Sequence, residues 1–206
     1  MGSISSGIMG LMFVISNSLL YPVVIALLIL VALSFVMLGQ FVSEYASRSR
    51  DFSRLKSGVK LAKENIELKN FKEASSALTN SGSNHFLKGF IKDLTETIGD
   101  ESFSVEAEKL LQDYELKIAR ELEFPRFVSR IAPMIGLMGT LIPMGPALIG
   151  LSSGDIQTLA SNLAIAFATT VLGLLAGGIA YAILLVKKRW YTQDLSDMEY
   201  VVEVLK

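Results

Sequence analysis

Three long stretches of the chain contain no Asp, Glu, Lys, Arg or His: residues 1–43, 131–154 and 156–186. A helix needs about 20 residues to cross the roughly 30 Å hydrocarbon core of a bilayer. A charged side chain at the centre of such a helix costs about 2.5–3.5 kcal/mol, so charge-free stretches of this length are typical of membrane spans. The pattern predicts an all-α membrane protein with three transmembrane helices, at 19–43, 131–151 and 156–186.

The segment between the first and second stretches has the opposite character. Residues 44–130 hold most of the 19 basic and 20 acidic side chains of the chain. Apolar residues recur there at the spacing of amphipathic helices, with breaks near 80–84 and 98–100. We therefore expect a helical domain at 44–130. Residues 1–18 are expected to form an N-terminal interfacial segment, and residues 187–206 a C-terminal helix.

The basic residues predict how the chain is oriented in the membrane. They cluster after the first span, before the second and after the third, whereas the short loop between the second and third spans has none. These clusters are Arg48, Arg50, Arg54 and Lys56; Arg126 and Arg130; and Lys187, Lys188 and Arg189. Cytoplasmic segments are enriched in Lys and Arg. We expect a multi-pass protein of the cell membrane, with the N-terminus outside and the helical domain and C-terminus cytoplasmic.

The second and third spans each carry one stripe of small, weakly polar residues at helical spacing. The members are Gly136, Thr140, Pro143, Ala147 and Gly150 in the second span, and Asn162, Ala166, Thr169, Thr170, Gly173, Gly177 and Ala180 in the third. Small residues let helices approach closely in lipid, so packing alone explains such stripes. Hydroxyl groups along a stripe also suit a hydrated pathway, and both interpretations can hold together. Prolines at 133, 143 and 146 are compatible with either one.

A proton pathway across a bilayer normally needs a titratable side chain. All three spans lack one, so a proton carrier would have to come from another chain. The sequence also lacks a glycine-rich phosphate loop, a nucleophile elbow and a zinc-protease motif, and its single His85 cannot form a metal site alone. We expect neither an enzyme nor a cofactor. Asp155, in the loop before the third span, is predicted to cap that helix.

Two segments resemble a known family. RIAPMIGLMGTL at 130–141 is similar to the second-helix signature APxxGLxGTV of the MotA/TolQ/ExbB proton-channel family, and AFATTVLGL at 166–174 is similar to its third-helix segment. The resemblance implies a homopentamer that encloses two copies of a MotB/TolR/ExbD-like single-span partner, whose Asp carries the proton. It implies that Thr140 and Thr170 face this Asp, and that Pro133, Gly136 and Gly173 occupy packing and bending positions. The implied ion is H⁺, with Na⁺ as the alternative.

The expected channel-lining or partner-facing residues are Thr140, Thr170, Thr169, Gly136, Pro133, Pro143, Ala166, Gly173 and Asn162. The chain departs from many members at Ile165, where a Glu is common, and at Pro143 and Pro146. The favoured hypothesis is a proton-channel or stator subunit of an energy-transducing motor complex. Two rivals stay open: a membrane scaffold that conducts no ions, in which the stripes only pack, and a secondary transporter subunit. The latter usually shows internal repeats.

Overall fold

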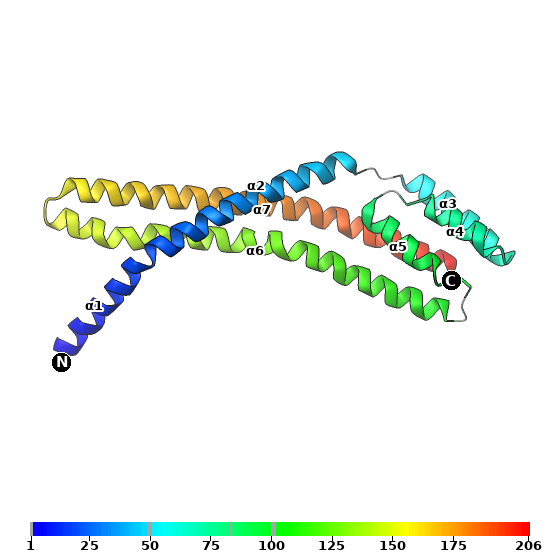
Figure 1. The fold of residues 1–206 in the computed structure, drawn as a ribbon, viewed down its shortest axis with the longest axis horizontal. Coiled ribbons are helices and arrows are strands. Elements are labelled where there is room, and N and C mark those ends of the chain that lie inside the picture. The colour runs from blue at the N-terminus through cyan, green and yellow to red at the C-terminus, as the bar shows by residue number, and fades with distance from the viewer. Residues whose placement is uncertain (1, 49–50, 83, 100–101) are drawn as a thin grey trace. The chain divides into compact units, whose positions relative to one another are not determined.

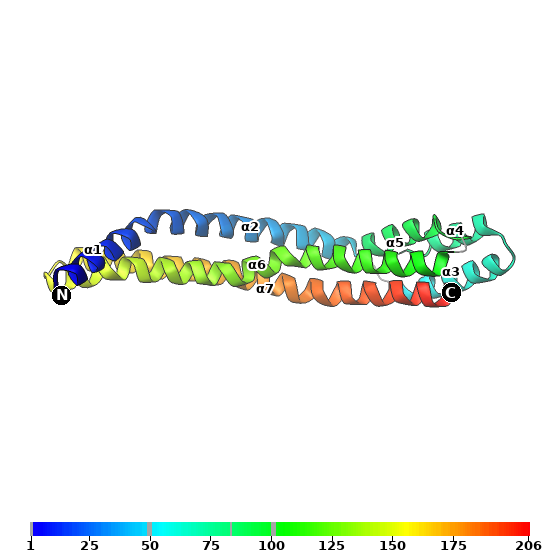
Figure 2. The same cartoon turned by 90° about the horizontal axis from the view of Figure 1, so that it is seen from below.

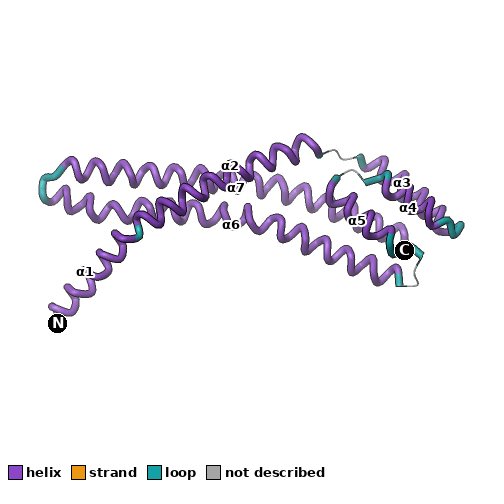
Figure 3. Tube along the Cα trace, in the orientation of Figure 1, coloured by secondary structure: helices purple, strands orange, loops and turns teal. Residues whose placement is uncertain are grey.

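The computed structural model describes residues 2–48, 51–82, 84–99 and 102–206, and within these ranges it contains helices and no strand. The elements are α1 (Gly2–Ser18), α2 (Leu20–Ser47), α3 (Phe52–Glu67), α4 (Phe71–Thr79), α5 (His85–Thr95), α6 (Phe103–Ser152) and α7 (Ile156–Leu205) (Figures 1 and 3). Arg50, Ser83 and Asp100, which entered the predictions of orientation and of helix breaks, lie outside the described residues.

Three helical stretches are long and apolar enough to cross a membrane: Gly7–Ser47, Phe103–Ser152 and Ile156–Leu205. The predicted all-α chain with three candidate membrane-spanning helices is therefore confirmed. Helices α6 and α7 are longer than the charge-free stretches within them, because Glu, Lys and Arg are good helix formers and do not end a helix. The apolar stretch predicts where a helix can meet lipid, and not where the helix ends.

The chain divides into two compact units. One combines the chain up to Phe41 with Phe124–Leu184, and the other combines Val42–Glu123 with Leu185–Lys206. In the first, which we call the span unit, α6 and α7 run side by side as a hairpin (Figures 1 and 2). Buried side chains of all three long helices form its core: Leu30, Met37, Val128, Ala132, Ala176, Ala180 and Ile183. Helix α2 thus packs against the hairpin.

A tight turn joins α6 to α7. Gly154 adopts a φ of 78°, which an L side chain rarely adopts, and Asp155 follows it. The Asp155 carboxylate accepts a hydrogen bond from the backbone N–H of Thr158 at 3.0 Å and one from the Thr158 hydroxyl at 2.5 Å. These bonds, the side-chain one first, lower the pKa of Asp155. The predicted helix cap is confirmed.

The second unit, which we call the charged unit, has its own hydrophobic core. The core contains Leu55, Val59 and Ala62 of α3, Ala74 and Leu78 of α4, Leu87, Phe90, Ile91 and Leu94 of α5, Ala107 and Tyr114 of α6, and Met198, Val201, Val202 and Leu205 of α7. Phe90 is fully buried, and its ring meets Tyr114 edge-on at a centroid distance of 5.4 Å. The predicted breaks are confirmed by the ends of α4 and α5.

One helix break was not predicted. Breaks were expected only near 80–84 and 98–100, but α3 ends at Glu67 and α4 begins at Phe71. Lys69 has a φ of 60° between them. A lysine in this left-handed conformation carries a steric cost, which the packing of α3 against α4 offsets. The α3–α4 hairpin is therefore imposed by tertiary packing.

Candidate functional site

Helices α6 and α7 approach each other most closely where glycines face each other. A Cβ built on Gly136 would lie 3.0 Å from the Cα of Gly173, and one built on Gly173 would lie 2.8 Å from the carbonyl oxygen of Ala132. A Cβ on Gly177 would lie 2.6 Å from the Pro133 ring. Only a missing side chain permits such contact between backbones. The glycines therefore set the spacing of the hairpin.

Most of the two predicted stripes is buried along this contact. The buried members are Gly136, Pro143, Ala147 and Gly150 of α6, and Ala166, Thr169, Gly173, Gly177 and Ala180 of α7. Thr169 lies against Gly139, since a Cβ on that glycine would come within 2.7 Å of the Thr169 Cβ. Its hydroxyl donates to the Ala166 carbonyl at 2.9 Å. Packing between α6 and α7 accounts for the glycines and Thr169, and Ala180 also lies in the core that α2 shares.

Thr140 and Thr170 are both half-buried, and they differ from the other members of the stripes because their hydroxyls contact each other across the hairpin. The Thr140 hydroxyl lies 3.1 Å from the Gly136 carbonyl oxygen and 3.4 Å from that of Ala166. The Thr170 hydroxyl lies 3.2 Å from the Ala166 oxygen. Each hydroxyl has one proton to donate. When Thr170 donates to Ala166, Thr140 can donate to Thr170, and the lone pairs of Thr140 stay free to accept.

The remaining predicted residues lie nearby with other roles. Pro133 is half-buried and packs on Gly177. Asn162 is also half-buried, and its amide donates to the Thr158 carbonyl of its own helix at 2.8 Å. The structure thus brings Thr140 and Thr170 together and leaves Asn162 with a partner in its own helix.

Four prolines lie inside α6, at 125, 133, 143 and 146. A proline has no N–H, so the carbonyl four residues earlier loses its usual helical donor. For Pro143 and Pro146 these carbonyls belong to Gly139 and Ile142, directly before and two residues after Thr140. The backbone next to the threonine pair therefore offers extra hydrogen-bond acceptors.

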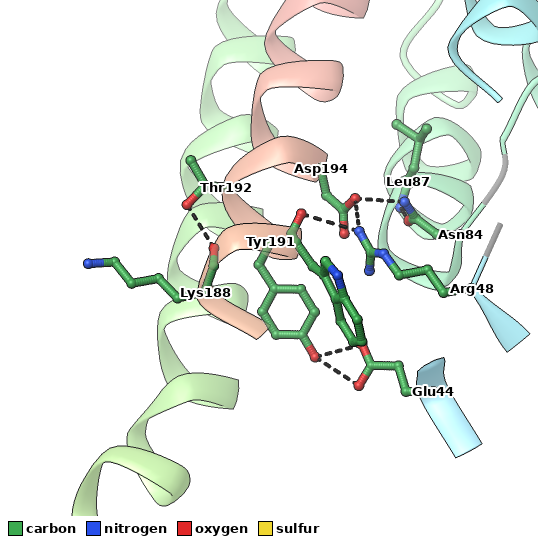
Figure 4. A network of polar contacts seen from close by, with 9 residues as sticks. Glu44, Arg48, Asn84, Leu87, Lys188, Tyr191, Thr192 and Asp194 are labelled. Carbon is green, nitrogen blue, oxygen red and sulfur yellow. Dashed lines mark hydrogen bonds and ion pairs between the residues drawn. The ribbon is translucent and has the colours of Figure 1, made fainter. Parts of the chain in front are cut away.

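A second group of polar residues, in the charged unit, was not predicted (Figure 4). Glu44, in the last turn of α2, accepts hydrogen bonds from the Tyr191 hydroxyl at 3.0 and 3.3 Å. It also pairs with the Lys187 ammonium at 2.7 Å. Burial, and then the charge of Glu44, raise the pKa of Tyr191, so this phenol stays protonated and donates. These contacts hold the end of α2 against α7.

The same group contains a fully buried carboxylate, Asp194, which lies beyond the apolar stretch that ends at Val186. Its Oδ1 accepts from Arg48 at 2.5 Å and from the amide of Asn84 at 2.8 Å. Arg48 also donates to the Trp190 carbonyl at 3.2 Å. The Asn84 oxygen in turn caps α5 by accepting from the Leu87 N–H at 2.8 Å. Burial raises the pKa of Asp194, although Arg48 acts against this.

The fold and these features together describe a multi-pass, all-helical membrane protein whose last two spans form a tight hairpin with a half-buried hydroxyl pair. Comparison with protein families matches residues 78–200 to the model described as the MotA/TolQ/ExbB proton channel family. The chain belongs to this family, and the predicted resemblance is confirmed. No curated protein matches the chain. Membership implies a channel and energy-transducing role of the stator type.

Proposed function

We propose that this chain is the channel-forming subunit of a proton-driven motor complex in the cell membrane. In this proposal five copies surround the single transmembrane helices of two MotB/TolR/ExbD-like partner chains, and a partner Asp carries the proton past Thr140 and Thr170. The observation that carries the proposal is the contact between these two hydroxyls at the half-exposed edge of the α6–α7 hairpin. Family membership supports the same reading.

The chemistry of the pair fits a carboxyl group that changes its protonation state. A protonated carboxyl is a donor, and the free lone pairs of Thr140 can accept from it. An ionised carboxylate needs a donor, and Thr140 can supply one by rotating its O–H away from Thr170. Because the Ala166 carbonyl keeps the Thr170 proton engaged, this rotation needs no movement of the helices. The pair can therefore solvate both forms of a partner acid.

The buried residues of the stripes have a different role in this proposal. Gly136, Ala166, Thr169 and Gly173 hold α6 and α7 together, and by doing so they keep the two hydroxyls in contact. The basic clusters that flank the spans support a cytoplasmic charged unit and C-terminus, with the N-terminus outside. We propose H⁺ as the ion. Hydroxyls and carbonyls can also serve Na⁺.

Thr170→Val tests the proposal, with Thr169→Val as its matched control. Both changes remove one hydroxyl from neighbouring positions of α7 and keep a similar shape, but Thr169 is buried against Gly139. Without the Thr170 hydroxyl, the Thr140 hydroxyl loses the neighbour that orients its O–H; such a neutral hydrogen bond contributes about 0.5–1.5 kcal/mol, so we expect Thr170→Val to slow proton flux roughly 2- to 10-fold. Thr169→Val should leave the flux near wild type. The measurement is proton uptake by proteoliposomes that contain the chain and its co-purified partner.

Three outcomes would contradict the channel. No single-span chain with a membrane-embedded Asp co-purifies, native mass spectrometry counts a different assembly, or Thr170→Val leaves the proton flux unchanged. Normal assembly without proton uptake by the wild-type complex would favour the non-conducting scaffold. Replacing the proton gradient by a sodium gradient in the same vesicles separates the two candidate ions.

A further inference from the structure

Asp194 presents an unusual buried carboxylate. Its side chain is fully buried, and both Arg48 and Asn84 donate to the same oxygen, Oδ1. Among the residues that the structure describes, the other oxygen, Oδ2, has no hydrogen-bond partner. An ionised carboxylate has about four lone-pair positions that require donors or water. One oxygen of this carboxylate therefore has no donor among the described residues.

The surroundings offset only part of the cost of a buried charge. Taking a carboxylate out of water costs several kcal/mol, and an ion pair repays this cost only when the remaining lone pairs are also satisfied. Within the described residues, the charged groups that face Asp194 are Arg48, which directly follows α2, and Asp197 on α7 itself. Asn84, before α5, contributes a neutral amide. A second acid nearby further disfavours the ionised form.

We propose that Asp194 is a proton-binding site: the closed network holds a proton on Oδ2, and release of that proton to solvent loosens the contact between the end of α2 and α7. No bond other than the O–H bond is made or broken. The site is separate from the threonine pair and lies in the other unit, so the inference does not depend on the proposed channel.

The direction of coupling follows from linkage. Burial raises the pKa of Asp194 in the closed network, whereas in an opened network the carboxyl is hydrated and returns toward its ordinary value. The state with the higher pKa binds the proton more tightly, so it is favoured at lower pH. The closed network is therefore expected to be tightest at low pH and to lose stability as the pH rises through the raised pKa.

Loosening of the Asp194 network would affect two helices, α2 and α5, at the same time. Arg48 joins the end of α2 to Asp194 and to the Trp190 carbonyl, and Asn84 joins Asp194 to the first turn of α5. Loss of the proton leaves an unsolvated charge that Arg48 and Asn84 can relieve only by admitting water. Proton release at Asp194 is thus coupled to the α2 end and the α5 cap.

The chain carries its own reporter for this change. Trp190 is its single tryptophan, it is buried, and the Arg48 guanidinium lies 5.0 Å from its ring centroid. The experiment follows Trp190 emission and its quenching by acrylamide in the full-length chain in liposomes, between pH 4.5 and 8.5. We expect a red shift and stronger quenching as the pH rises, with a midpoint above about 3.9, where an exposed Asp titrates.

Three variants test which residue causes the pH-dependent change in Trp190 emission. Asp194→Asn is a neutral mimic, and we expect it to keep Trp190 protected at every pH and to lose the transition. Glu44→Gln and His85→Gln each remove one other titratable group of the region, and the transition should persist in both. A wild-type signal that does not change with pH would overturn the inference without any variant. The inference is also overturned if Asp194→Asn retains the transition. It is equally overturned if Asp194→Asn exposes Trp190 at neutral pH, because that result would mean that the network needs the ionised carboxylate as the partner of Arg48.

Discussion

Replacing Gly173 by alanine is expected to separate the two helices of the span-unit hairpin. The new Cβ would lie 2.8 Å from the carbonyl oxygen of Ala132 and 2.8 Å from the Cα of Gly136. Both neighbours are backbone atoms, which cannot rotate away as the end of a side chain can. Overpacking commonly costs about 1–3 kcal/mol, and a backbone clash on two sides should lie at or above the upper end of that range. Thr140 and Thr170 would then lose their contact.

Gly178→Ala is the matched control on the same helix, because a Cβ at Gly178 would have no atom within 4 Å. The chain contains no cysteine, so Thr140→Cys with Thr170→Cys gives a clean background for disulfide trapping. We expect rapid disulfide formation in that background and with Gly178→Ala, and much slower formation with Gly173→Ala. Equal rates for the two alanine variants would show that the glycine contact does not position the hydroxyl pair.

Phe90→Ala should be the most damaging single truncation in the charged unit. The ring is fully buried in the core, and its edge-on contact with Tyr114 adds to the burial. Truncating a buried Phe to Ala removes about 3–5 kcal/mol of stability, because a cavity remains where the ring was. Since Phe90 lies on α5, the loss of stability should extend to the helices that pack against α5 and to the Asn84 cap at its start.

Hydrogen exchange of the full-length chain measures this loss by segment. We expect faster exchange throughout the charged unit in Phe90→Ala and unchanged exchange in the parts of α6 and α7 that belong to the span unit. Leu61→Ala is the control within the same unit, because Leu61 is 53% exposed and its truncation leaves no cavity. If Leu61→Ala raised exchange as much as Phe90→Ala does, the core would not be centred on α5.

The sequence predicted the helices better than it predicted their faces. Charge-free stretches predict where a helix can lie in lipid, and the turn-forming residues at 80–84 predict a helix break. The break at Lys69 carries no comparable signal, because a lysine in the left-handed conformation is chosen by the packing of α3 on α4 and not by local preference. Long-range packing therefore decided the one break that was missed.

The candidate site was predicted only as a pair of stripes. A stripe at helical spacing is about 100° wide, so it contains residues that face the neighbouring helix and residues at its edge. Thr169 and Thr170 are adjacent in sequence, yet the first is buried and the second half-buried. Only the position of α6 distinguishes them.

The polar network around Asp194 was missed for a different reason. Arg48 and Asp194 are separated by 146 positions in the sequence. In a charge-rich segment, each of these residues resembles part of a solvated helix face. Helical spacing also does not show which residue on another helix is the partner. The regular spacing of Lys187, Tyr191 and Asp194 is the only local hint, and it is compatible with many exposed helices.

Two prolines of α6 lie in the half of the hairpin nearer to the Gly154 turn, where they affect backbone hydrogen bonding. Pro143 and Pro146 leave the carbonyl oxygens of Gly139 and Ile142 without their usual donors, on either side of Thr140. In a hydrocarbon environment an oxygen left in this state is costly, so it must recruit a water molecule or a donor from another chain. The stretch around Thr140 should consequently stay wet even in a resting complex that moves no protons.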